Sequence, residues 1–180
     1  MERSGVKTHK SHTRWRKDPP KPRRHKRDLE FSKGGAKMLS SEYRHSVDPK
    51  NRLFIPAKHR EVLTRNDDSF VVTAAMRDKC LRIFSISEWK EYAAGYEKFQ
   101  GRERTKLLRK LYKDMITPTP DSQGRIVLTP ALLEYAGITK NAVIVGCGKY
   151  AEIWDEETYD AMMAEDDSDL DDIIDMVGLY

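Results

Sequence analysis

Two segments of the chain, 73 residues apart, share one order of polar and apolar positions. The first segment reads DPKNRLFIP from Asp48, and the second reads DSQGRIVLTP from Asp121. In each, a polar stretch that ends in arginine is followed by three apolar residues. Short apolar runs bounded by turn-forming residues are typical of buried strands. The pattern therefore predicts strands over 52–55 and 125–128, each launched from a tight turn.

The repetition continues beyond this motif. Residues 70–72 align with 143–145 at the same offset, and the apolar positions of 81–84 align with those of 151–154 at an offset of 70. Apolar runs of this kind, separated by a polar or glycine-containing stretch, predict β-hairpins. The two expected hairpins join 70–74 to 80–84 and 142–146 to 150–154. We therefore interpret the chain as two pseudo-symmetric units.

Each unit also carries the signals of a short helix after its first strand. Pro56 and the pair Thr129-Pro130 stand where these helices would begin, because proline suits the first helical position and threonine can cap it. Gly137 followed by the apolar Ile138 is typical of a helix that ends on a glycine.

A second helix is expected after each hairpin. Ser85 and Glu88 have the spacing of a capping box, and Asp155 followed by two glutamates suits the start of the matching helix. In the first of these helices five residues recur at helical spacing: Trp89, Tyr92, Ala93, Tyr96 and Phe99. One helix cannot hide so many aromatics, and a strand over 70–74 would leave an unpaired edge. We therefore expect a homo-oligomer that closes into a ring.

The helix expected between the units, residues 101–116, carries two stripes. One is apolar, and the other is basic with positions at i, i+4, i+7 and i+11. The basic positions are Arg102, Lys106, Arg109 and Lys113. Two interpretations of this stripe stay open, a solvated helix face and a surface that faces phosphates.

Charge is distributed unevenly along the 180 residues. The net charge is +4, but residues 1–37 carry +9, residues 38–149 carry +7 and residues 150–180 carry −12. Such a basic body favours a polyanionic partner. Two interpretations of the acidic tail stay open, a segment that masks the basic surface by folding back and a disordered tail that only adds solubility. We expect residues 1–37 to be a disordered basic extension, and we expect the folded part to start at Met38.

Several classes of protein are excluded by the residues that the chain lacks. No stretch approaches the roughly 20 apolar residues of a membrane span, and the two cysteines, Cys80 and Cys147, form no disulfide framework. We expect a cytoplasmic protein with no membrane partner. The stretch Gly146-Cys147-Gly148-Lys149 lacks the spacing of a phosphate-binding loop, and no nucleophile motif is present. An enzyme is therefore not expected, and neither is a cofactor or a metal site.

The turn before each strand has a chemistry of its own. Asn51 and Gly124 occupy the same slot, and these residue types most readily adopt a positive φ. An aspartate three residues before that slot can accept hydrogen bonds from turn amides and can fix the direction of the arginine. One copy would indicate only a capped turn with a local salt bridge. Two copies in a basic body favour arginines that are held out for a partner.

These segments resemble the MraZ family of bacterial regulators, which is encoded at the head of the division and cell-wall gene cluster. The resemblance covers roughly residues 38–160 and rests on MLSSEYRHSVDPKNRLFIPAKHRE and DSQGRIVLTPALLEYAGITKNAVIVGCGKYAEIWDEETY. It implies an α+β fold rich in β structure, with two AbrB-like swapped-hairpin units that form a small double-psi-like β-barrel with flanking helices. The expected divisions are 1–37, 38–100 (first unit), 101–116 (linker helix), 117–162 (second unit) and 163–180 (acidic tail).

The resemblance also implies a function. It implies a sequence-specific repressor in the cytoplasm and nucleoid that binds short promoter repeats in double-stranded DNA as a ring-shaped homo-oligomer. The family's motif arginines correspond to Arg52 and Arg125, and its motif aspartates to Asp48 and Asp121. From the motif turns themselves we add Lys50 and Gln123 as DNA-binding residues, and Asn51 and Gly124 as residues that orient the motif. The linker departs from the family pattern, which has aromatic and small residues there. Two alternatives stay open: an RNA-binding protein that uses the basic extension, and an antitoxin-like protein-interaction module.

Overall fold

The computed structural model describes residues 38–165, 174, 176 and 177, which belong to one compact unit. The predictions for the basic extension and for most of the acidic tail therefore lie outside the described residues.

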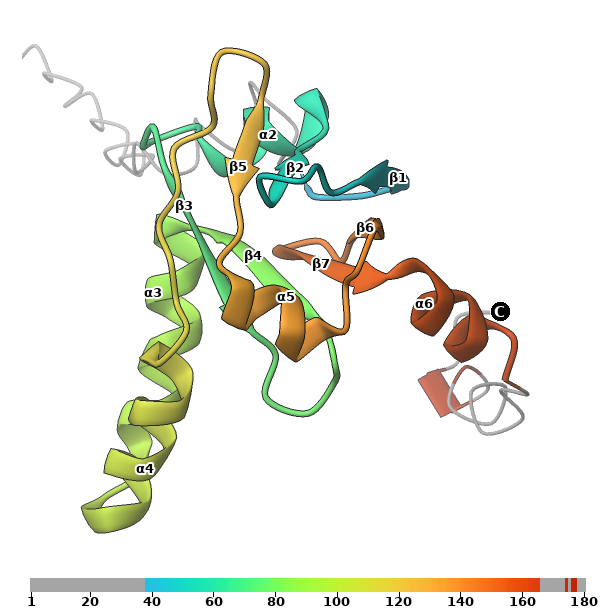
Figure 1. The fold of residues 1–180 in the computed structure, drawn as a ribbon. Helices are drawn as coiled ribbons and strands as arrows, with labels where there is room; N and C mark the ends of the chain where they lie inside the picture. The colour runs from blue at the N-terminus through green and yellow to red at the C-terminus, as the bar shows by residue number, and fades with distance from the viewer. Residues whose placement is uncertain (1–37, 166–173, 175, 178–180) are drawn as a thin grey trace, which may run out of the picture. The chain divides into compact units, whose positions relative to one another are not determined.

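The described residues form short strands that alternate with helices (Figure 1). In chain order the elements are β1 (Glu42–Ser46), β2 (Arg52–Phe54), α2 (Ala57–Leu63), β3 (Phe70–Ala74), β4 (Leu81–Ser85), α3 (Ile86–Ala94), the 3₁₀ helix η1 (Gly95–Lys98), α4 (Gly101–Tyr112), β5 (Arg125–Val127), α5 (Pro130–Ala136), β6 (Asn141–Gly146), β7 (Tyr150–Asp155) and α6 (Glu156–Met163). Both expected hairpins are present, as β3–β4 and β6–β7.

The larger sheet has five antiparallel strands in the order β1-β6-β7-β4-β3. Its central pair, β4 and β7, places Leu81 opposite Ile153 and Ile83 opposite Ala151. In the sequence repeat Leu81 corresponds to Ala151 and Ile83 to Ile153, so exchanging the two halves leaves this register unchanged. The pseudo-twofold relation inferred from the sequence therefore runs between β4 and β7.

A second, two-stranded ladder joins β2 to β5, with Leu53 opposite Ile126 at its centre. The closed barrel that the resemblance implied is not formed by the described strands, which lie in two separate sheets. The physical reason is that β2 and β5 have only three residues each and use their ladder hydrogen bonds on one another. The coarse expectation of a mixed fold of helices and antiparallel strands is confirmed.

The outer edge of β3 is covered by the chain that follows α4. Val72 and Ile116 exchange two backbone hydrogen bonds of 2.9 Å, and the N–H of Phe70 donates to the carbonyl of Pro118. The open edge expected for strand 70–74 is therefore closed within the chain. Ile116 lies 73 residues after Tyr43, so this segment is the counterpart of β1 in the second half.

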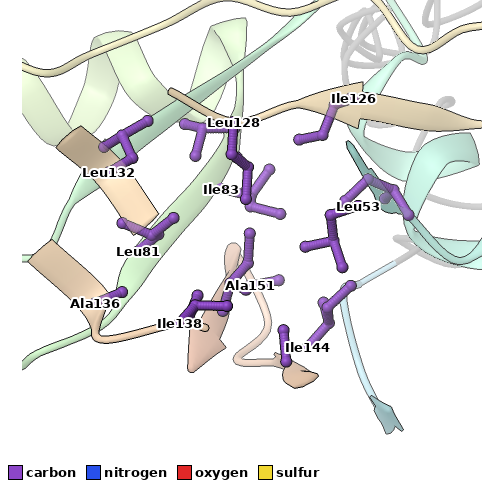
Figure 2. Close-up of a cluster of buried hydrophobic side chains, with 14 of the residues drawn as sticks. Leu53, Leu81, Ile83, Ile126, Leu128, Leu132, Ala136, Ile138, Ile144 and Ala151 are labelled. Carbon is purple, nitrogen blue, oxygen red and sulfur yellow. The ribbon is translucent and has the colours of Figure 1, made fainter. Parts of the chain in front are cut away.

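One core lies between the ladder and the larger sheet. Leu53 and Ile126 point inward from the ladder and are 0% and 1% exposed. Figure 2 shows them in a cluster with Ile83, Ile144 and Ala151 of the sheet. Burial of a large aliphatic side chain contributes about 1.5–3 kcal/mol. Because both halves of the chain supply these side chains, they share one stabilising core.

The caps of the short helices follow the sequence signals. Thr129 Oγ1 accepts a hydrogen bond from the N–H of Leu132 at the start of α5, and Gly137 ends that helix with φ 69°. The capping box before α3 is only half formed. Ser85 Oγ accepts from the N–H of Glu88, but the Glu88 carboxylate lies 3.4 Å from Lys149 Nζ.

The aromatic helix differs from its prediction. α3 ends at Ala94 and continues as the 3₁₀ helix η1, so Phe99 falls beyond both and is 48% exposed. Trp89 is only 6% exposed, because the rings of Phe84 and Tyr112 each lie 5.6 Å from its own. The chain therefore covers Trp89 itself, whereas Phe99 and Tyr112 stay exposed, and the homo-oligomer remains an expectation.

Candidate nucleic-acid interface

The β2–β5 ladder has one buried and one outward face. Side chains alternate along a strand, so the face opposite Leu53 and Ile126 carries the remaining four residues of the ladder. These are Arg52 opposite Val127 and Phe54 opposite Arg125. The side chains of the two arginines are 30% and 28% exposed. As diagonal neighbours in an antiparallel pair, they are separated by roughly 7–8 Å.

The first motif turn, residues 48–52, is held together by one carboxylate. Asp48 Oδ1 accepts hydrogen bonds from the backbone N–H groups of Lys50 (2.8 Å) and Arg52 (3.0 Å). Asp48 Oδ2 accepts from Arg52 Nε at 2.6 Å. Asn51 has φ 58°, the positive value that the sequence predicts. One side chain therefore closes the turn and also sets the direction of the arginine.

The second motif turn, residues 121–125, repeats this geometry. Asp121 Oδ1 accepts from the backbone N–H groups of Gln123 and Arg125, both at 2.9 Å. Asp121 Oδ2 accepts from Nε (2.9 Å) and Nη2 (2.7 Å) of Arg125. Gly124 has φ 79°. The hydrogen bonds leave both terminal nitrogens of Arg52, but only Nη1 of Arg125, without a partner among the described residues.

Both carboxylates are held in their charged form. Hydrogen bonds from the Arg125 side chain, followed by its backbone N–H, lower the pKa of Asp121 to about 2. The backbone N–H of Arg52 is the largest cause that lowers the pKa of Asp48. The two aspartates are therefore ionised at neutral pH and can orient the guanidinium groups.

Each motif turn is also tied to the opposite strand. The carbonyl of Asn51 accepts a hydrogen bond from the N–H of Leu128 at 2.9 Å. The carbonyl of Gly124 accepts from the N–H of Ile55 at 3.0 Å. The positive-φ residues thus extend the ladder at both of its ends, and they fix the turns that carry Arg52 and Arg125.

Arg60 is a third arginine beside this face, and sequence reasoning missed it. Arg60 Nη1 donates to the carbonyl of Ile55 at 2.7 Å, and its Cζ lies 5.3 Å from the centre of the Phe54 ring. The same guanidinium rests against Gly124, where a Cβ atom would overlap it. The repeat places Leu133 at the matching position of the second half. The replacement of an apolar leucine by a charged arginine at equivalent positions of the repeat is the one sequence signal that could have indicated a role for Arg60.

The other residues predicted to bind DNA lie at the tips of the turns. Lys50 and Gln123 are exposed, and their side chains have no hydrogen-bond or ion-pair partner among the described residues. Cys80 is buried, and burial raises the pKa of its thiol. The part of the chain that the structure describes holds no group of three side chains that could bind a metal ion. The arginine face is therefore the main candidate site.

Comparison with known proteins identifies the family. The family model described as MraZ protein matches residues 38–110 and 113–173. The chain belongs to the MraZ family. A relative named transcriptional regulator MraZ, from Ligilactobacillus salivarius, is 36% identical over 138 residues, which cover 76% of this chain and 94% of that protein.

Two further MraZ relatives agree with this assignment. The transcriptional regulator MraZ of Dictyoglomus thermophilum is 34% identical over 131 residues, or 72% of this chain and 87% of that protein. The protein of the same name from Oleidesulfovibrio alaskensis is 35% identical over 129 residues, or 71% and 87%. These names describe regulators, which agrees with the interpretation that the chain is not an enzyme. Among the described residues no helix has the length and apolar character to cross a membrane.

Proposed function

We propose that this chain is a sequence-specific DNA-binding regulator of transcription. Its MraZ relatives are named transcriptional regulators. The observation that carries the proposal is the pair of arginines on one outward face of the ladder, each aimed by its own aspartate. A capped turn needs the aspartate but does not need an arginine at the same place in both copies.

The ladder has the form of a reading element for duplex DNA. A two-stranded β-ribbon fits the major groove, where arginine most often donates two hydrogen bonds to a guanine edge. The strand positions of Arg52 and Arg125 are diagonal neighbours roughly 7–8 Å apart, close enough for both side chains to enter one major groove. In this proposal each arginine reads one guanine. Lys50 and Gln123 would contact the flanking phosphates from the turn tips.

The ladder takes one strand from each half of the chain. This arrangement supports the finer expectations drawn from the resemblance. Pairing of β2 with β5 and of β4 with β7 is what two interlocked AbrB-like hairpin units would produce. In this proposal several chains form a ring and bind short promoter repeats together, so that weak single contacts add through avidity. The ring that is bound to DNA represses transcription of the division and cell-wall gene cluster. The protein is located in the cytoplasm and at the nucleoid.

The test begins with selection of duplexes from a random DNA pool on the purified full-length protein. Binding to the enriched duplex is then compared between the parent and the Arg52→Ala and Arg125→Ala variants. Each substitution should weaken binding to the enriched duplex by about 1–3 kcal/mol if the arginine reads a guanine. The decrease in affinity should be larger on the enriched duplex than on random duplex. Lys50→Ala should weaken both alike and reduce the salt slope by about one.

A matched control separates base reading from loss of charge. Arg77 is exposed in the β3–β4 connection, so Arg77→Ala removes the same side chain at a distance from the ladder. This variant should bind the enriched duplex like the parent. If Arg52→Ala and Arg125→Ala stay folded and also bind it like the parent, the motif is a structural turn. Enrichment of RNA over duplex DNA in a parallel selection would likewise overturn the proposal.

A further inference from the structure

A second basic surface lies on α4 and on Lys113, which follows α4 as its C-cap with helical backbone angles. Its members Arg102, Lys106, Arg109 and Lys113 are all exposed. At 3.6 residues per turn these positions fall within about 60° of one another around the helix axis. They span roughly 16 Å along the axis at 1.5 Å per residue. We refer to these four residues as the α4 stripe.

The α4 stripe faces away from the body of the protein. Leu111, which is 1% exposed, is the buried residue of α4 and lies about 170° around the axis from the centre of the stripe. The hydroxyl of Thr73 on β3 donates a buried hydrogen bond of 3.1 Å to the carbonyl of Leu111. The helix is therefore fixed to the sheet by its opposite side, so the direction of the stripe is fixed as well.

The charges of the stripe are almost uncompensated. Residues 101–116 contain six bases but only two acids, Glu103 and Asp114. The one ion pair that the stripe forms within the described residues joins Lys113 Nζ to Asp114 at 3.7 Å. Some exposed cations elsewhere are neutralised, such as Arg44, which contacts Glu42, Glu156 and Asp160, but others, such as Arg77 and Lys90, are unpaired among the described residues, like most of the stripe. What sets the stripe apart is that four unneutralised or weakly paired bases lie in one row, which favours an extended external anion.

We propose that the α4 stripe is a second, sequence-independent binding site for the phosphate backbone of duplex DNA. Figure 1 shows α4 extending away from β2 and β5, so this site and the ladder address different segments of DNA. The chain would then hold two duplex segments together. That consequence, although not the phosphate site itself, rests on the function proposed for the ladder.

The composition of the stripe favours phosphates over a protein partner. Protein interfaces are built around an apolar centre that is depleted in charge. The α4 stripe consists of basic residues alone and offers no such centre. Backbone binding to DNA is supplied almost entirely by lysine and arginine that displace counterions. Duplex DNA carries one charge per about 1.7 Å, so a row of roughly 16 Å can meet several phosphates at once.

The experiment uses the full-length protein and two variants that each lose four positive charges. The stripe variant replaces the four residues of the α4 stripe with glutamine. The control variant makes the same change at four exposed bases on other elements: Arg65, Arg77, Lys90 and Lys140. Affinity for a random-sequence duplex is measured by fluorescence anisotropy at several salt concentrations. Bridging is measured as capture of a labelled second duplex on beads that carry the first.

The stripe variant should lose about 0.9 from the salt slope for each phosphate contact removed, or about 3.6 if all four residues contact phosphates. It should also lose capture of the second duplex, whereas the control variant should keep most of both. Equal losses in the two variants would overturn the proposal, because net charge would then be the cause. An altered particle mass by light scattering, with an unchanged salt slope, would also overturn it by pointing to a protein partner.

The ladder can be tested separately in the same assays. Arg52→Ala should reduce discrimination between the enriched and random duplexes and should leave the salt slope of the stripe in place. If the parent protein does not discriminate between enriched and random duplexes, but the stripe variant still loses salt dependence of binding, the function proposed for the ladder fails and the phosphate site stands. If discrimination is normal and the stripe variant matches the control, the phosphate site fails alone.

Discussion

Gly124 offers a sharp test of how the second motif turn is built. An alanine there must adopt φ 79°, which costs an L-residue about 1–2 kcal/mol. Its Cβ atom would also overlap the Arg60 guanidinium, which must then leave the carbonyl of Ile55, 2.7 Å away. Loss of that half-exposed hydrogen bond costs about 1 kcal/mol. Gly124→Ala should therefore lower the free energy of unfolding by about 2–3 kcal/mol in total.

Gly137 provides the matched control. It has φ 69°, and a Cβ atom there would meet nothing within 4 Å. Gly137→Ala should therefore show only the backbone cost of about 1–2 kcal/mol. Combining Gly124→Ala with Arg60→Ala removes the overlap, so the double variant should be less destabilised than the sum of its two single variants by about 1 kcal/mol.

The assay is urea unfolding followed by circular dichroism. The midpoints should shift while the dependence of free energy on urea stays constant, because the surface exposed on unfolding does not change. Equal effects of Gly124→Ala and Gly137→Ala, together with strict additivity between Gly124→Ala and Arg60→Ala, would refute the contact between Arg60 and Gly124. The turn would then depend on backbone conformation alone.

Three further predictions concern the same face and its support. Ile126→Ala should destabilise the chain by about 2–5 kcal/mol in urea unfolding, whereas its neighbour Val127, which is 58% exposed, should tolerate alanine within about 0.5 kcal/mol. The pKa of Asp121 is about 2 in the folded chain and about 3.9 for an ordinary aspartate. Its contribution to stability is therefore complete above about pH 4 and is lost as the pH falls through about 2, so acid titration of Asp121→Asn should show a shallower loss than the parent. Burial lowers the pKa of His45, so the unfolded chain binds its proton more readily and stability falls below about pH 6.5; thermal melts between pH 8 and 5 should show a smaller fall in His45→Gln.

Local features of the fold were accessible from the sequence. The positive φ of Asn51 and Gly124 follows from residue type in a repeated slot. Thr129 and Gly137 mark the ends of α5 because capping depends on the few residues around a helix end. The same holds for the hairpins β3–β4 and β6–β7, whose strands are neighbours in the chain. In each case the information lies within about ten residues.

Features that depend on distant partners were not accessible. β1 was missed because its pairing with β6 depends on residues far along the chain, and its sequence EYRHS alternates only weakly. Ile116 was not expected to cover β3, since one bridge leaves no periodic signal. Arg60 gains its place from contact with Gly124, in the other half of the repeat. The burial of Trp89 was not expected, because the sequence could not show Tyr112 packing on it.

The exchange of strands between the two halves has a consequence for synthesis of the chain on the ribosome. β1 ends at Ser46 and its partner β6 begins at Asn141, so at about 5–20 residues per second roughly 5–20 s separate the emergence of the two strands. In the same way, β2 cannot pair until β5 has been synthesised, and β4 cannot pair with β7 until β7 has been synthesised. During this interval the nascent first half holds only its own hairpin, and its unpaired edges resemble those that recruit other chains into aggregates. We therefore expect translation speed and chaperone access over residues 46–155 to affect the yield of this protein independently of the stability of its finished fold.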